Sequence, residues 1–179
     1  MNFLKLKNKQ GFTLAEMMVT LVIFGLIFTL ALVNFRRGER LEAFRLTAEQ
    51  VAGNLRLAQT QALTGISEDE ALAQAYGIYF SLNEAGQYIL FKDQGDRLYG
   101  IGDQVVATVI LSEEITLSGL TSDPLTIVFE PPKPAIYING DIALAAVQIN
   151  LARAYFPDKV GRITLNRLTG QVSARLLNQ

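Results

Sequence analysis

The sequence predicts an α+β protein in which one long N-terminal helix precedes an antiparallel, β-rich domain. Three observations lead to this fold class. An apolar run covers residues 12–33, a polar and apolar pattern with helical spacing covers residues 34–64, and short segments of alternating apolar residues recur within residues 65–179. Because no proline interrupts the first two patterns, they are expected to form one helix of about 50 residues.

The apolar run has the length of a membrane span and carries a single carboxylate. Three lysines and Gly11 precede the run, and residues 12–33 number about 22, enough at 1.5 Å per residue to cross a hydrocarbon core about 30 Å thick. Glu16 lies near its start. A charged side chain within such a span costs roughly 2.5–3.5 kcal/mol. Glu16 therefore either reaches water at the membrane edge or has a specific partner.

The stretch GFTLAEMMVTLVIFGLI resembles the N-terminal signature of the type IV pilin and pseudopilin superfamily. In that family the leader ends at glycine, phenylalanine usually follows, and glutamate is the fifth residue after the cut. Gly11, Phe12 and Glu16 match these positions. The resemblance implies that a prepilin peptidase removes residues 1–11 by cutting between Gly11 and Phe12. It further implies that the new amine of Phe12 is methylated and that the apolar run is retained.

The same resemblance gives Glu16 a role in filament assembly. Cleavage would leave a positively charged amine on Phe12, four residues before Glu16. We expect that one helix does not easily bring its own terminus onto this carboxylate, so the amine of a neighbouring subunit is the expected partner. Such a pair in a low dielectric would favour the correct register between subunits.

Charges on the two sides of the apolar run do not decide its orientation by the positive-inside rule. Lysines precede it and arginines follow it: Lys5, Lys7 and Lys9, then Arg36, Arg37, Arg40 and Arg45. A bacterial inner-membrane location with the C-terminal domain in the periplasm is implied by the resemblance alone. The end of the run, LALVNF, lacks the helix-bending proline of many major pilins, and so differs from them.

Residues 34–64 are expected to pack one face of the helix on the domain. Apolar residues recur there at intervals of three and four, as in an amphipathic helix. They are Leu41, Phe44, Ala48, Val51, Leu55, Ala58 and Ala62. Gly25, Gly38 and Gly53 are expected weak points of the helix, and Gly65 is its expected C-terminal cap.

The β-rich domain is expected from alternating apolar residues separated by turn sequences. Tyr76, Ile78, Phe80 and Leu82 alternate before the turn NEAG, and QYILFK returns as a hairpin. Further strands are expected at residues 104–111, 114–119, 125–130, 135–139, 142–152, 161–166 and 170–177. In the last hairpin, Ile163 and Leu165 are expected to share a face with Val172, Ala174 and Leu176.

Composition excludes several classes of active site. The chain contains neither cysteine nor histidine, so it offers no disulfide, no thiolate nucleophile, no Cys/His zinc site and no Ser-His-Asp relay. No catalytic residue, metal site or cofactor is predicted. Removing the three lysines of the leader would lower the formal charge from −1 to −4, which argues against nucleic-acid binding.

Two acidic segments are expected to be structural. Asp93, Asp96 and Asp103 lie in the loop KDQGDRLYGIGD, whose spacing does not match an EF-hand, so we expect turn roles for them rather than calcium binding. Residues 68–70, Glu-Asp-Glu, are expected to begin a short solvated helix. The aromatic residues of the first hairpin could stack nucleobases, but their alternation favours core positions.

The C-terminal half carries a second resemblance. The order IVFEPPKPAIYINGD, VQINLA and GRITLNRLTGQVSARL is similar to the closing part of H-type minor pseudopilins of type II secretion and of similar minor pilins. The resemblance implies a filament subunit whose partners are other pilin-like subunits, the prepilin peptidase, the inner-membrane assembly platform and the lipid bilayer. A minor pilin of a type IV pilus or DNA-uptake filament, and an unrelated single-span protein with a β-rich binding module, remain alternatives.

Overall fold

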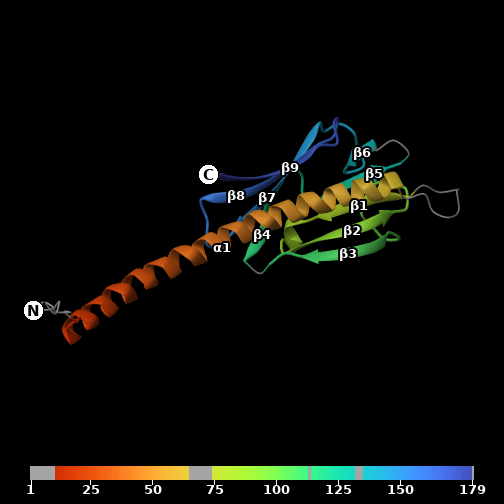
Figure 1. Cartoon of the computed structure of the whole chain (residues 1–179). Coiled ribbons are helices and arrows are strands. Elements are labelled where there is room, and N and C mark those ends of the chain that lie inside the picture. Colours follow the sequence, from red (N-terminus) through yellow and green to blue (C-terminus); the bar gives the residue numbers. More distant parts are fainter. Residues whose placement is uncertain (1–10, 65–73, 113, 132–134, 179) are drawn as a thin grey trace, which may run out of the picture. The chain divides into compact units, whose positions relative to one another are not determined.

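The computed structural model describes residues 11–64, 74–112, 114–131 and 135–178. These residues form one long helix followed by antiparallel strands, which confirms the predicted α+β class (Figure 1). The chain divides into two compact units, residues 1–41 and 42–179, which are considered separately. Most of the predicted leader, Gly65 and the acidic residues 68–70 lie outside the described residues.

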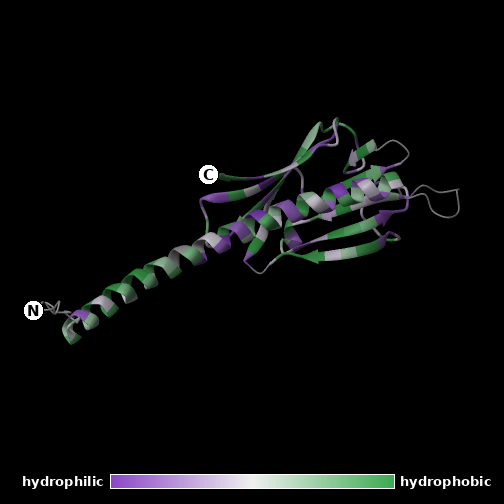
Figure 2. Cartoon of the chain, in the orientation of Figure 1, coloured by the Kyte–Doolittle hydropathy of each residue, from purple (hydrophilic) through white to green (hydrophobic). Residues whose placement is uncertain are grey.

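Helix α1 begins at Leu14 and ends at Thr64, and it runs without a break through Gly25, Gly38 and Gly53. Within the first unit, the segment Leu14–Leu32 is almost entirely apolar (Figure 2). Leu14–Leu32 has a mean hydropathy of 2.2, and by length and composition this segment is able to cross a membrane. The side chains of Leu14–Leu32 are exposed in the described structure. An apolar surface of this kind requires lipid or other apolar helices around it.

The second unit contains the C-terminal part of α1 and two antiparallel sheets. Sheet A has the strand order β3-β2-β1-β5-β6, and sheet B has the order β4-β7-β8-β9. The strands of sheet A are β1 (Ala75–Phe80), β2 (Gln87–Asp93), β3 (Gln104–Ile110), β5 (Leu125–Glu130) and β6 (Ala135–Ile138). Those of sheet B are β4 (Ile115–Leu120), β7 (Ala146–Arg153), β8 (Lys159–Asn166) and β9 (Val172–Asn178).

One hydrophobic core joins α1 to both sheets. Phe44, Ala48, Val51, Leu55, Ala58 and Ala62 are buried in it, as the helical spacing predicts, and Leu41 is half-buried. Two hydrogen bonds tie the polar side of the helix to the sheets. Asn54 Nδ2 donates to Tyr88 Oη on β2 at 2.7 Å, and Arg56 Nη2 donates to the Val172 carbonyl on β9 at 2.8 Å.

The last hairpin has the predicted register. Ile163 pairs with Ala174 and Leu165 pairs with Val172 on the core side of the sheet. Gly170 closes the turn with φ of 68°, a conformation that favours glycine. A side chain there would also meet Gln59 of α1, whose Nε2 atom lies 2.7 Å from the position of a Cβ. The glycine is therefore favoured by the turn, whereas the clash with Gln59 involves only the flexible end of that side chain.

Several of the predicted boundaries are wrong, and strand β8, for example, begins at Lys159 rather than at residue 161. Leu82 does not continue β1, because Ser81 Oγ accepts a hydrogen bond from the Asn83 N–H and starts the short 3-10 helix η1, Leu82–Glu84. Strand β7 begins at Ala146 rather than at residue 142, since Ile138 forms a bridge with Asp141 in the turn that precedes it. Strand β9 begins at Val172, two residues after the expected start.

Candidate functional site

The N-terminal motif lies where α1 begins. Gly11, Phe12 and Thr13 are not helical, and the first helical hydrogen bond runs from the Met17 N–H to the Thr13 carbonyl at 3.1 Å. Thr13 thus occupies the N-cap position, and Glu16 is the third residue of the helix. Gly11, Phe12, Thr13 and Glu16 border one open depression of about 500 Å³.

Thr13 and Glu16 form a reciprocal capping box. The Glu16 N–H donates to Thr13 Oγ1 at 3.3 Å, and the Glu16 carboxylate accepts from both the N–H and the hydroxyl of Thr13 at 3.4 Å. Such a box satisfies two of the N–H groups that the first turn of a helix leaves without a partner. The carboxylate is therefore held by its own helix in the isolated chain.

The Glu16 carboxylate thus reaches back to the backbone N–H of Thr13, one residue after Phe12. Sequence reasoning missed Thr13 itself. The signal was present, because Thr13-Leu14-Ala15-Glu16 has the spacing of a capping box directly before an apolar run.

The three aspartates of the loop between β2 and β3 also lie together. One ligand atom from each of Asp93, Asp96 and Asp103 lies within 4.8 Å of the others. Their oxygens accept hydrogen bonds from the backbone of the same loop. Asp93 accepts from the N–H groups of Gly95 and Arg97 at 3.0 Å, Asp103 from those of Gln94 and Gly100 at 3.1 and 2.9 Å, and Asp96 from that of Leu98 at 3.1 Å.

Asp93 is the buried member of the group, with 8% of its surface exposed. Burial raises its pKa to about 6, and a hydrogen bond with Asp96 and the charge of Asp103 act in the same direction. Hydrogen bonds from the N–H groups of Gly95 and Arg97 oppose this rise. The arrangement matches the predicted turn role, since each carboxylate already serves the loop backbone.

This loop places two side chains, Arg97 and Tyr99, against aromatic residues of sheet A. The Tyr99 ring lies 4.7 Å from that of Tyr79 and 5.1 Å from that of Phe91, measured between centroids. The Arg97 guanidinium lies 4.0 Å over the Tyr137 ring and pairs with Glu130 at 3.1 Å. The loop thereby covers a second, smaller apolar cluster on this sheet.

Three aromatic residues of the first hairpin, Phe80, Tyr88 and Phe91, are buried core residues, whereas Tyr76 and Tyr79 are half-buried. Phe80 and Tyr88 are buried in the main core and stack with centroids 5.3 Å apart. Phe91 is buried under Tyr99 on the other face. Burial also raises the pKa of the Tyr88 hydroxyl, while its hydrogen bond with Asn54 acts in the opposite direction.

Among the described residues, one helix, near the N-terminus, is long and apolar enough to cross a membrane, and a β-rich unit follows it, which is the arrangement of a protein anchored by a single helix. Residues 6–32 match the family model of the prokaryotic N-terminal methylation motif. This match supports the type IV pilin and pseudopilin superfamily and indicates a type IV pilin-like subunit. No curated protein and no solved structure matches the chain significantly.

The match bears on the predicted activity and partners as well. Type IV pilin-like proteins are structural subunits rather than enzymes, and the motif implies processing by a prepilin peptidase and assembly with other pilin subunits. The roles of Gly11, Phe12 and Glu16 within this motif, and the choice of machine, are developed below as proposals.

Proposed function

We propose that the chain is a minor pseudopilin of a type II secretion pseudopilus, and that it assembles through its apolar N-terminal helix to help drive protein export across the outer membrane. The observation that carries this proposal is the position of Glu16. It is the only charged residue of Leu14–Leu32, and it lies one turn from the start of an exposed apolar helix within residues that match the methylation motif.

In this proposal residues 1–11 are a leader that is cut between Gly11 and Phe12, and Phe12 is then methylated. The helix anchors the subunit in the bacterial inner membrane with its β-rich unit in the periplasm. The exposed apolar side chains of Leu14–Leu32 first contact lipid and later the helices of neighbouring subunits. The inner-membrane assembly platform is the expected partner for that transfer.

Glu16 would exchange one partner for another during assembly. Its hydrogen bonds to Thr13 are long, at 3.4 Å, and join the carboxylate to uncharged donors. The positively charged amine of Phe12 on an incoming subunit is a stronger donor, since charge-assisted hydrogen bonds are about twice as strong as neutral ones. The capping box would therefore hold the carboxylate until the amine replaces it, and the register of the subunits follows from this pair.

The test compares Glu16→Ala with Thr13→Ala and with Glu39→Ala, which removes an exposed carboxylate of α1 outside the apolar segment. We expect Glu16→Ala to insert and to be cleaved but to lose crosslinking into the filament and the secretion it drives. Glu39→Ala should assemble normally. If Glu16 acts only as a helix cap, Thr13→Ala will reproduce its defect; if it pairs with an amine, Thr13→Ala will retain assembly.

The alternatives make distinct predictions. A minor pilin of a type IV pilus or DNA-uptake filament would share the processing and the Glu16 phenotype, and the function lost on deletion would be pilus formation or DNA uptake. An unrelated single-span protein with a β-rich binding module would keep residues 1–11. Mass spectrometry of the membrane-bound chain distinguishes this last case, because a chain that still begins at Met1 contradicts the proposal.

A further inference from the structure

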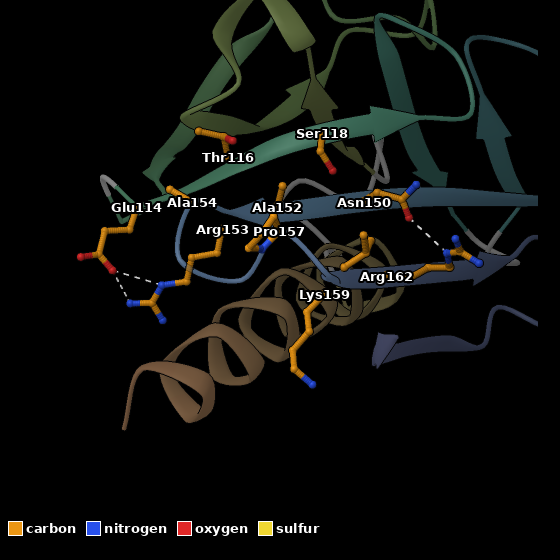
Figure 3. A pocket seen from close by; sticks show the side chains of 11 residues that line it. Glu114, Thr116, Ser118, Asn150, Ala152, Arg153, Ala154, Pro157, Lys159 and Arg162 are labelled. Carbon is orange, nitrogen blue, oxygen red and sulfur yellow. Dashed lines mark hydrogen bonds and ion pairs between the residues drawn. The ribbon is translucent and has the colours of Figure 1, made fainter. Parts of the chain in front are cut away.

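Sheet B is a basic surface on an acidic protein. Its four strands contain Arg153, Lys159, Arg162 and Arg175 and no aspartate or glutamate, whereas the calculated isoelectric point of the whole chain is about 5.5. Arg153 is neutralised by an ion pair with Glu114, just before β4 (Figure 3). The other three cations form no ion pair with any carboxylate of the described residues.

Two of these cations share the face of sheet B that points away from α1. Val172, Ala174 and Leu176 contact the main core on the opposite face, so Arg175 points outward. Arg162 is its direct partner across the ladder between β8 and β9 and therefore projects from the same face. Thr116 and Ser118 of β4 are exposed on this sheet.

The opposed arginines are unfavourable in the isolated chain. Like charges directly opposite each other on neighbouring strands destabilise the pairing. An anion bound by both guanidinium groups would replace this repulsion with attraction. Such a pair of arginines is expected where a bound molecule supplies negative charge.

Arg162 is also oriented. Its Nε atom donates to Asn150 Oδ1 on β7 at 3.2 Å (Figure 3), and among the described residues its two terminal nitrogens donate no hydrogen bond, so they remain able to bind a ligand. Gly119 of β4 lies opposite Asn150 in the ladder between β4 and β7. Asn150, Arg162, Thr116 and Ser118 line a groove of about 550 Å³.

We propose that this face binds an acidic peptide segment of a partner protein, with Arg162 and Arg175 receiving its carboxylates. The planar guanidinium group binds a carboxylate through two parallel hydrogen bonds. The hydroxyl groups of Thr116 and Ser118 and the amide of Asn150 are neutral groups able to bind a peptide backbone. The site goes beyond the proposed filament role and does not depend on it.

A peptide fits this face better than a nucleic acid does. The described residues that line the groove include three cations, Arg153, Lys159 and Arg162, but Arg153 is paired with Glu114, whose carboxylate would repel a polyanion. None of the residues that line the groove is aromatic, so the groove has no platform for stacking bases. A short segment with two or three carboxylates matches the number of cations.

The experiment measures binding to the full chain in a zwitterionic detergent by fluorescence anisotropy. The probe is a fluorescein-labelled peptide of alternating glutamate and serine, and the comparison probes are the same peptide with glutamine and an oligothymidylate of equal charge. We expect the acidic peptide to bind, and Arg162→Gln and Arg175→Gln each to weaken its binding about tenfold, as for loss of one charge-assisted hydrogen bond. Lys92→Gln on sheet A removes the same charge and should leave binding unchanged.

Arg175→Gln also separates binding from folding. Without peptide, this variant should melt at a temperature equal to or above that of the wild type, because the like-charge pair is removed. A loss of affinity together with retained stability supports the proposal, even if Arg162→Gln folds poorly. Equal binding of the glutamine peptide, unchanged affinity of Arg175→Gln, or tighter binding of the oligothymidylate through the same arginines would each overturn it.

Discussion

The packing of α1 is tested most directly by two leucines that lie two positions apart on the same helix. Leu55 is fully buried, with 0% of its surface exposed, whereas Leu57 is 47% exposed. Both are replaced by alanine in a fragment that begins at Arg36. Because the residue types and the helix are the same, the change in helix propensity is common to both variants and only burial differs.

The expected magnitude for Leu55→Ala follows from its surroundings. The substitution removes three carbon atoms from a core that contacts both sheets, at about 0.8 kcal/mol per buried methylene, and leaves a cavity. Together these costs lower the free energy of unfolding by about 3–5 kcal/mol. Leu57→Ala should change it by about 0.5 kcal/mol or less.

Urea unfolding followed by circular dichroism measures the difference. With a urea dependence of about 2 kcal/mol per molar for a domain of this size, the midpoint of Leu55→Ala should fall by about 1.5–2.5 M, while that of Leu57→Ala should hardly move. Equal shifts for the two variants would refute the reasoning, because the helix would then not use one face to pack on the sheets.

Three further predictions test other parts of the chain. Gly77→Ala should destabilise the second unit by about 1–3 kcal/mol in the same urea assay, because the new Cβ would lie 2.4 Å from the buried ring of Phe91. Asp93 has a pKa of about 6 in the folded chain against 3.8 as its ordinary value, so its stabilising contribution is present below about pH 4 and is lost as pH rises through 6. Asp93→Asn should lack this slope, so the difference between the variant and wild-type urea midpoints should change as pH rises from about 4 to above 6; parallel pH profiles would contradict it. Gly11→Val should block removal of the leader, as read by mass spectrometry of the membrane fraction, and normal cleavage of this variant would place the cut elsewhere.

The parts of the fold that the sequence predicts well are those set by local periodicity. The buried face of α1 follows from spacings of three and four, and the register of the last hairpin follows from alternation on both strands and a glycine in its turn. Neither depends on residues far away in the chain. The order of the strands in the two sheets could not be predicted from the sequence. Strand β1 pairs with β5, and β4 pairs with β7, across long separations in sequence that no local pattern reveals.

The sites divide in the same way. Glu16 was identified from a contiguous motif, and its hydrogen bonds with Thr13 are local, so a closer reading of four residues would have found them. Arg162 and Arg175 lie opposite each other on β8 and β9, as the alternation along the last hairpin implies. The groove that Arg162 lines is formed by residues of β4, β7 and β8, and Tyr99 reaches Phe91 from a loop. Neither arrangement can be read from one segment of the sequence, because each requires separate strands and loops to come together.

The capping box at Thr13 has a consequence for proteolysis. A cap ends the cooperative growth of a helix, and here it does so one residue beyond the bond between Gly11 and Phe12. The backbone around this bond is not helical, so a peptidase that requires an extended backbone could bind it without first unfolding a turn of helix. Without the threonine hydroxyl, the helix could grow backward through Phe12, and the bond proposed for cleavage would become a slower substrate although neither residue beside it had changed.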